Sequence, residues 1–129
     1  MLFALRTKDR LHLVARRRLT QLANENAKLM APDSAIYEYY TVVRSLGKPP
    51  SDTRAVLLAL VQKLKTYRIE EKSTFSVRTL ALQSKLEAQY GLTYFDSLIA
   101  ASALSLDAIV VSDDTAFNRV PGLQRISLS

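Results

Sequence analysis

The stretch from Gly91 to Phe117 reads GLTYFDSLIAASALSLDAIVVSDDTAF. Its first half predicts a short amphipathic helix, and the apolar run from Ala108 to Val111 predicts a buried strand. A helix that leads into a strand with two apolar faces is typical of a parallel α/β sheet. Ligands bind such sheets outside the carboxyl ends of the strands. The acidic turn directly after this strand, at Asp113 and Asp114, is therefore a candidate functional site.

Upstream of this stretch, apolar residues recur at helical spacing in four segments. We expect helices that begin at Asp9, at Ser34 and at Ser51 or Asp52, and a fourth over roughly 74–90 that ends at Gly91. The candidate strands are short and cover residues 28–31, 67–70 and 124–128. Because no repeat or linker interrupts the chain, we expect a single α/β domain over residues 1–129, rich in helix.

Composition limits the classes of protein that this chain represents. A hydrophobic content of 48% and a mean hydropathy of +0.01 are typical of an ordinary globular domain. No apolar run approaches the ~18 residues of a membrane-spanning helix, and the N-terminus does not resemble a signal peptide, so we expect a cytoplasmic protein with no membrane partner. The absence of cysteine excludes disulfides and thiolate metal sites. A net charge of +6 favours polyanionic partners such as nucleic acid or an acidic protein segment.

Two acidic residues on predicted helices are candidate metal ligands. Glu38 lies on the flank of the apolar stripe of its helix, and its alternative role is that of an ordinary solvated glutamate. Asp96 fits a capping box that begins at Thr93. Its helical neighbours are apolar or small, so its carboxylate is expected to point toward packed structure, where an unpaired charge is costly. Capping and metal binding are both compatible with this position.

The acidic turn after the predicted strand supplies the remaining ligands. Either Asp113 or Asp114 is suited to cap the short helical turn that begins near Ala116, and Ser112 is suited to the same cap or to hold a carboxylate or water. Clustered carboxylates raise one another's pKa unless a cation neutralises them. Oxygen ligands without His or Cys suit Mg²⁺ or Mn²⁺ rather than Zn²⁺. The pattern predicts that Glu38, Asp96 and Asp114 share one such ion.

Basic and aromatic side chains suggest contacts with a nucleic acid. The candidates for phosphate contact are Arg16, Arg17, Lys63, Lys65 and Arg68, and the alternative for each is a solvated helix face. Tyrosines cluster at positions 37, 39 and 40. We expect two of these three rings to lie in the core rather than to form a platform for bases.

Residues 91–123 resemble the C-terminal half of PIN-domain ribonucleases, especially the VapC-type toxins. These proteins share an aspartate that opens a small-residue helix, an apolar strand, a Thr/Ser-x-Asp turn and a phenylalanine. The matching residues here are Asp96, Ser112, Asp114 and Phe117. Upstream, APDSAIYEYYTVVRSLG resembles the second helix of the family, with Glu38 at its acidic position. The resemblance covers nearly the whole chain.

This resemblance implies a PIN-like three-layer fold with a short, mostly parallel sheet flanked by helices. It implies a metal-dependent ribonuclease that hydrolyses RNA phosphodiester bonds and serves as the toxin of a type II toxin–antitoxin pair. Glu38, Asp96 and Asp114 would be the catalytic metal ligands, with Ser112 and Asp113 in support. RNA, an antitoxin protein and a second copy of the chain would be its partners. The alternative is a catalytically impaired PIN-like module that binds RNA or protein.

The N-terminus departs from the family pattern. The family opens with a strand that ends in an aspartate, whereas residues 1–5 resemble the segment just after that aspartate, and Asp9 comes too late to replace it. We therefore expect an N-terminally truncated domain that lacks the usual first strand. Such a gap has three explanations: a start upstream of Met1, a true loss of the site, or a partner chain that fills the position.

Overall fold

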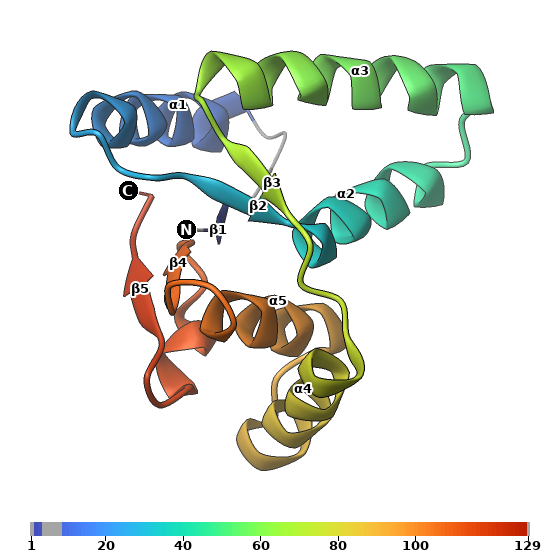
Figure 1. Cartoon of the computed structure of the whole chain (residues 1–129). Coiled ribbons are helices and arrows are strands. Elements are labelled where there is room, and N and C mark those ends of the chain that lie inside the picture. The colour runs from blue at the N-terminus through green and yellow to red at the C-terminus, as the bar shows by residue number, and fades with distance from the viewer. Residues whose placement is uncertain (1, 4–8, 129) are drawn as a thin grey trace.

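Short strands and longer helices alternate along this chain, in a computed structural model that describes residues 2–3 and 9–128, with side chains from Arg16 onward (Figure 1). The strands are β1 (Leu2–Phe3), β2 (Met30–Pro32), β3 (Glu70–Lys72), β4 (Ile109–Val111) and β5 (Gln124–Ile126). The helices are α1 (Asp9–Asn24), α2 (Asp33–Ser45), α3 (Pro50–Thr66), α4 (Val77–Tyr90) and α5 (Tyr94–Leu104), with a 3₁₀ turn, η1 (Thr115–Arg119). No helix in the described ranges is long and apolar enough to cross a membrane.

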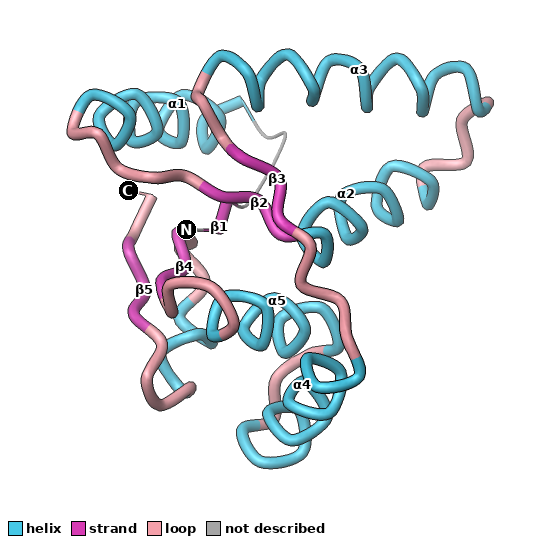
Figure 2. Tube along the Cα trace, viewed as in Figure 1, coloured by secondary structure: helices cyan, strands magenta, loops and turns pink. Residues whose placement is uncertain are grey.

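The strands form two short parallel sheets, which confirms the predicted class of fold. One sheet has the order β1-β4-β5, and the other pairs β2 with β3 (Figure 2). Strand β1 also contacts β2, so the two sheets adjoin. Helices α1 and α3 lie on one side of the strands and α4 and α5 on the other, which gives three layers (Figure 1). Because β4 is the middle strand of its sheet, the acidic turn that follows it lies at the centre of one sheet edge.

The core consists of two clusters that meet at β4. Val111 belongs to a cluster that contains Leu19 of α1 and Leu64 of α3. Val110 belongs to the other, together with Ile99 of α5. Successive side chains of a strand point to opposite faces, and both valines are fully buried. This arrangement confirms the prediction of a strand with two apolar faces.

Several boundaries differ from those predicted. The strand expected at 67–70 lies at Glu70–Lys72, because α3 continues to Thr66 and then closes through a bond from the Ile69 amide to the Leu64 carbonyl (2.8 Å). Arg68 takes the left-handed conformation (φ 54°) that this type of helix end requires. At the other end of α3 neither Ser51 nor Asp52 caps the helix, which begins at Pro50 after Pro49. Proline suits a first helical position because its fixed φ is already helical.

Helix α4 begins three residues later than predicted and ends as predicted. Ser76 caps it by accepting a hydrogen bond from the Thr79 amide (3.0 Å). Gly91 ends it in the left-handed conformation (φ 64°), which glycine adopts at little cost. Thr74 stays outside the helix because its side chain is engaged by α2 and α5, as described below.

The N-terminal apolar residues form a short strand, β1, although the family's usual first strand was expected to be missing. Strand β1 pairs parallel to β4, with Leu2 opposite Val110 and Phe3 opposite Val111. The apolar residues at the start of the chain therefore cover one edge of β4 in place of an exposed edge. Asp9, the first aspartate of the printed sequence, lies in α1.

Candidate active site

The first turn of α5 and the turn after β4 lie at the same end of the fold. Helix α5 leads into β4 through a short connection and packs against both β4 and η1. In a parallel α/β unit the helix runs antiparallel to the strand that follows it, so its N-terminus lies at the carboxyl end of that strand. Asp96 in α5 and Asp114 after β4 therefore belong to the same edge of the sheet.

Asp114 caps the 3₁₀ turn η1. Its Oδ1 accepts a hydrogen bond from the Ala116 amide (2.9 Å), which confirms that one of the paired aspartates is a cap. The Asp114 amide in turn donates to Oγ of the buried Ser112 (3.1 Å). Ser112 therefore positions the backbone of Asp114 and, through it, the Asp114 side chain. Among the described residues, Asp114 accepts a hydrogen bond only at Oδ1, so Oδ2 is available to a ligand.

Strand β5 and the C-terminal residues hold the same turn from the other side. Oδ1 of Asp113 accepts hydrogen bonds from Ser127 Oγ and the Leu128 amide, both at 2.8 Å. The Arg125 guanidinium donates to the Ser112 carbonyl (3.0 Å). Asp113 thus links the turn to the end of the chain. Its supporting role at a metal stays a prediction.

Helix α2 approaches the first turn of α5 through two aromatic rings. The ring centroids of Tyr37 and Phe95 are 6.3 Å apart. Glu38 and Asp96 are the residues that directly follow them, and both are partly buried. Thr93 caps α5 by accepting a hydrogen bond from the Asp96 amide (3.2 Å), so the predicted capping position is also confirmed. The contact brings together the segments that carry two predicted ligands, Glu38 and Asp96, which are 58 residues apart in the chain (96 − 38).

The carboxylates do not form a ready metal-binding group. Within residues 16–128, whose side chains the structure describes, no set of three or more His, Cys, Asp or Glu side chains is placed to hold a metal ion. Oδ1 of Asp113 and Oδ1 of Asp114 each accept a hydrogen bond from a backbone amide. The donors at this edge are all oxygens, with Oδ2 of Asp114 available, and oxygen donors fit Mg²⁺ or Mn²⁺. The ligand set Glu38, Asp96 and Asp114 stays a prediction.

Asp33 is a functional candidate that the sequence analysis missed. Its carboxylate accepts hydrogen bonds from the amides of Ser34 (2.9 Å), Thr74 (2.9 Å) and Phe75 (3.0 Å) and from the Thr74 hydroxyl. Partial burial alone would raise the pKa of Asp33, but these bonds together lower it below its ordinary value. The only local signal was an aspartate in the first turn of a helix after proline. Its main partners lie about forty residues away, where no local pattern reveals them.

A buried chain of hydroxyls continues from Asp33 into α5. Oγ of Ser34 lies 2.6 Å from Oγ of Ser102, and Thr74 Oγ1 lies 2.8 Å from the same atom. Ser34 and Ser102 are completely buried. These contacts join α2, α5 and the segment before α4. They fix the relative placement of the two helices that carry Glu38 and Asp96.

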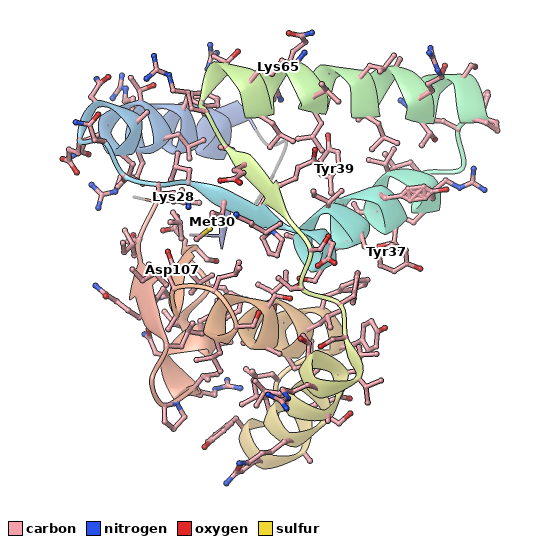
Figure 3. All side chains as sticks on the ribbon, in the orientation of Figure 1. Lys28, Met30, Tyr37, Tyr39, Lys65 and Asp107 are labelled. Carbon is pink, nitrogen blue, oxygen red and sulfur yellow. The ribbon has the colours of Figure 1, made fainter. Side chains whose placement is uncertain are left out.

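The predicted phosphate-contacting residues lie on α1 and at the end of α3. Arg16 and Arg17 are exposed on α1, and Lys65 and Arg68 are exposed at α3, with Lys63 partly buried. Both helices pack against the same core cluster. Lys65 lies on the outer side of α3, away from the strands (Figure 3). Contact with phosphate stays a prediction for all five residues.

Comparison with known proteins agrees with the resemblance. The sequence matches the PIN domain family over residues 1–123. A similar solved structure is the crystal structure of VapBC2 from Rickettsia felis bound to a DNA fragment from their promoter, with 24% identity and a TM-score of 0.64. The similarity covers 87% of this chain and 83% of that one. None of the curated proteins compared with this sequence matches it. The match over residues 1–123 shows that the chain belongs to the PIN domain family.

Proposed function

We propose that this protein is a metal-dependent ribonuclease that hydrolyses RNA phosphodiester bonds as the toxin of a toxin–antitoxin pair. The observation that carries this proposal is the meeting of α2 and α5 at Tyr37 and Phe95, beside Glu38 and Asp96. Membership of the PIN domain family and the structural similarity to a VapBC2 protein support it. The divalent metal, the RNA substrate and the individual ligands are parts of the proposal.

The proposed mechanism assigns roles to metal ligands, to residues that position them and to basic residues that bind RNA. Glu38, Asp96 and Asp114 would hold Mg²⁺ or Mn²⁺, an ion that lowers the pKa of a bound water and stabilises the charge that develops on the phosphate. Ser112 positions Asp114 through its backbone amide, and Asp113 braces the turn against the C-terminal residues. Arg16, Arg17, Lys63, Lys65 and Arg68 would bind the RNA backbone and make affinity dependent on salt.

Partners follow from the same proposal. The similar structure is a VapBC2 assembly bound to promoter DNA. By analogy we assign this chain an antitoxin protein and a second copy of itself as partners, and activity in the cytoplasm. A strongly basic chain of net charge +6 is suited to bind both RNA and an acidic segment of such an antitoxin.

A catalytically impaired RNA- or protein-binding module is the second candidate. One observation favours it: the described side chains include no group of three or more His, Cys, Asp or Glu placed to hold a metal ion. Such a module would bind RNA in EDTA as well as in Mg²⁺ and would cleave it in neither.

Cleavage of labelled RNA by the purified chain separates the two functions. For the ribonuclease we expect cleavage in Mn²⁺ or Mg²⁺, none in EDTA, and a loss of at least a hundredfold in the variant Asp114→Asn. Asp52→Asn is the matched control, because Asp52 is exposed on α3. Calorimetric titration with Mn²⁺ should show weaker binding in Asp96→Asn and Glu38→Gln. Unchanged Mn²⁺ affinity in both variants contradicts the ligand assignment.

A further inference from the structure

Four aromatic rings gather where α2 meets α5. Tyr37 and Tyr40 are stacked, with nearly parallel planes (12°) and centroids 6.5 Å apart. Phe95 contacts Tyr37 on one side and Tyr94 on the other, with the latter pair in an edge-to-face arrangement at 5.0 Å. We call Tyr37, Tyr40, Tyr94 and Phe95 the aromatic cluster.

The cluster is more exposed than folding alone explains. Tyr37 is 49% exposed and Tyr94 is 56% exposed. By contrast, Tyr39 packs against the core cluster of α1 and α3, and burial raises its pKa. Tyr37 and Tyr39 lie on opposite sides of α2, with Tyr39 toward α3 (Figure 3). Large aromatic rings left together in water commonly mark a binding surface.

The cluster begins at the proposed catalytic carboxylates. Tyr37 is next to Glu38 in α2 and Phe95 is next to Asp96 in α5. The contact between the Tyr37 and Phe95 rings, at 6.3 Å, places the cluster where the two segments that carry these carboxylates meet. Tyr40 then leads away from the carboxylates. It lines a hollow of about 280 Å³ between α2 and α3, together with Arg44 and Arg54. Arg44 lies on α2 beyond Tyr40, and Arg54 lies on the facing helix α3.

This order of groups matches a single strand of nucleic acid. Every base has a flat π face that stacks on an aromatic ring, and the phosphates that follow attract arginine. In a duplex the faces of the bases are already stacked on one another and are not available. Alanine in place of a base-stacking ring weakens single-strand binding roughly 5- to 140-fold.

We propose that the aromatic cluster stacks bases of a single-stranded RNA beside the scissile phosphate, and that Arg44 and Arg54 contact the phosphates beyond it. This inference rests on the proposed ribonuclease function and names the residues that hold the bases and the neighbouring phosphates. Tyr37 is the central ring, because it contacts both Tyr40 and Phe95.

The test measures binding of a labelled short oligouridylate by fluorescence anisotropy in EDTA, where no metal-dependent cleavage occurs. We expect Tyr37→Ala and Tyr37→Leu to weaken binding roughly 5- to 140-fold, and Tyr37→Phe to bind like the native chain, since it keeps the ring. Val77→Ala is the remote control, because Val77 is 86% exposed on α4. Thermal melts check that each variant folds.

A second oligonucleotide separates stacking from general contact. When the bases are replaced by abasic sites, the native chain and Tyr37→Leu should bind equally weakly, because no face remains to stack. Native affinity for the oligouridylate should exceed affinity for the same strand in a duplex with oligoadenylate. Equal loss of single-strand and duplex binding in Tyr37→Leu overturns the proposal.

The outcomes distinguish this proposal from the ribonuclease function. If Tyr37→Leu weakens single-strand binding but no cleavage occurs in Mn²⁺, the base-stacking role of the aromatic cluster is supported and the ribonuclease function is wrong. If cleavage depends on Mn²⁺ but Tyr37→Leu binds the oligouridylate normally, the ribonuclease function is supported and the base-stacking role of the aromatic cluster is wrong. If Tyr37→Leu instead weakens binding only of an acidic helical peptide, the cluster is a protein-docking surface and the RNA proposal is wrong.

Discussion

The carboxylate of Asp33 joins the start of α2 to the segment before α4. In Asp33→Asn the side chain keeps its shape, but one acceptor oxygen becomes an NH₂ group that faces the amides of Thr74 and Phe75. Leaving buried donors without an acceptor costs about 1–3 kcal/mol. We expect urea denaturation to show a loss of that size. Asp52→Asn, at an exposed position of α3, should change the free energy of unfolding by less than about 0.5 kcal/mol. A native-like midpoint for Asp33→Asn contradicts this role.

The same residue predicts how stability depends on pH. The pKa of Asp33 is lower in the folded chain than its ordinary value of 3.8. Its contribution is therefore fully present above pH 3.8 and is lost as the pH falls through the lower folded pKa. We expect the difference in unfolding free energy between the native chain and Asp33→Asn to be constant near neutral pH and to shrink in acid. A difference that grows in acid reverses the sign and excludes the proposed hydrogen bonding.

Some residue roles were predictable from the sequence and others were not. Asp114 and Thr93 cap their helical turns as predicted, because a cap acts on amides two or three residues away. Asp33 acts on amides at positions 74 and 75, so its role depends on how α2 meets the segment before α4. The ligand role of Glu38 likewise depends on the meeting of α2 with α5, which no local pattern encodes.

At the scale of elements, hydroxyl groups hold α2 against α5. The Ser34–Ser102 pair is completely buried, and Ser102 Oγ also contacts the Leu98 carbonyl (2.9 Å) and Thr74 Oγ1 (2.8 Å). Removal of the Ser102 hydroxyl therefore takes the partner of a buried Ser34 hydroxyl away, whereas Ser102 keeps two partners in Ser34→Ala. We expect Ser102→Ala to lower the free energy of unfolding by about 1–3 kcal/mol and Ser34→Ala by about 0.5–1.5 kcal/mol. The double variant should lose less than the sum of the two, with a coupling of at least about 0.5 kcal/mol. Strict additivity in a urea double-mutant cycle contradicts the coupling. Ser84→Ala, in the exposed part of α4, is the control.

Element types were more predictable than element ends. Helical periodicity located α1 to α5, and the apolar run located β4, because these signals extend over whole segments. The ends of α3 and the position of β3 were shifted by local turns: a proline start at Pro50 and a left-handed residue at Arg68. Thr74 was assigned to α4 by sequence, yet its hydroxyl contacts Asp33 and Ser102 and keeps it outside.

At the scale of the whole molecule, the largest departure concerns the N-terminus. The sequence suggested a sheet without a strand next to β4, whereas β1 takes that place through Leu2 and Phe3. Two apolar residues carry too weak a pattern to predict a strand by themselves. Backbone pairing with β4 stabilises this short strand, because the edge of β4 would otherwise present unpaired N–H and C=O groups.

The net charge of +6 predicts that the affinity of the chain for RNA falls as the salt concentration rises. For single strands, the logarithm of the binding constant falls with the logarithm of salt concentration by about 0.7 for each neutralised phosphate. If Arg44 and Arg54 contact phosphates beyond the aromatic cluster, Arg44→Gln with Arg54→Gln should reduce the slope by about 1.4. Tyr37→Leu should weaken binding at every salt concentration and leave the slope unchanged, because stacking releases no counterions.

The basic helices provide the comparison for this measurement. Arg16→Gln with Arg17→Gln removes the same charge from α1, so any general effect of net charge should appear equally in both double variants. An equal reduction in slope for the two pairs is the general effect of net charge and does not place the RNA between α2 and α3. An unchanged slope for Arg44→Gln with Arg54→Gln shows that the strand does not pass between α2 and α3. Because charge variants change the slope and ring variants change the intercept, one salt titration in EDTA separates the path of the backbone from the position of the bases.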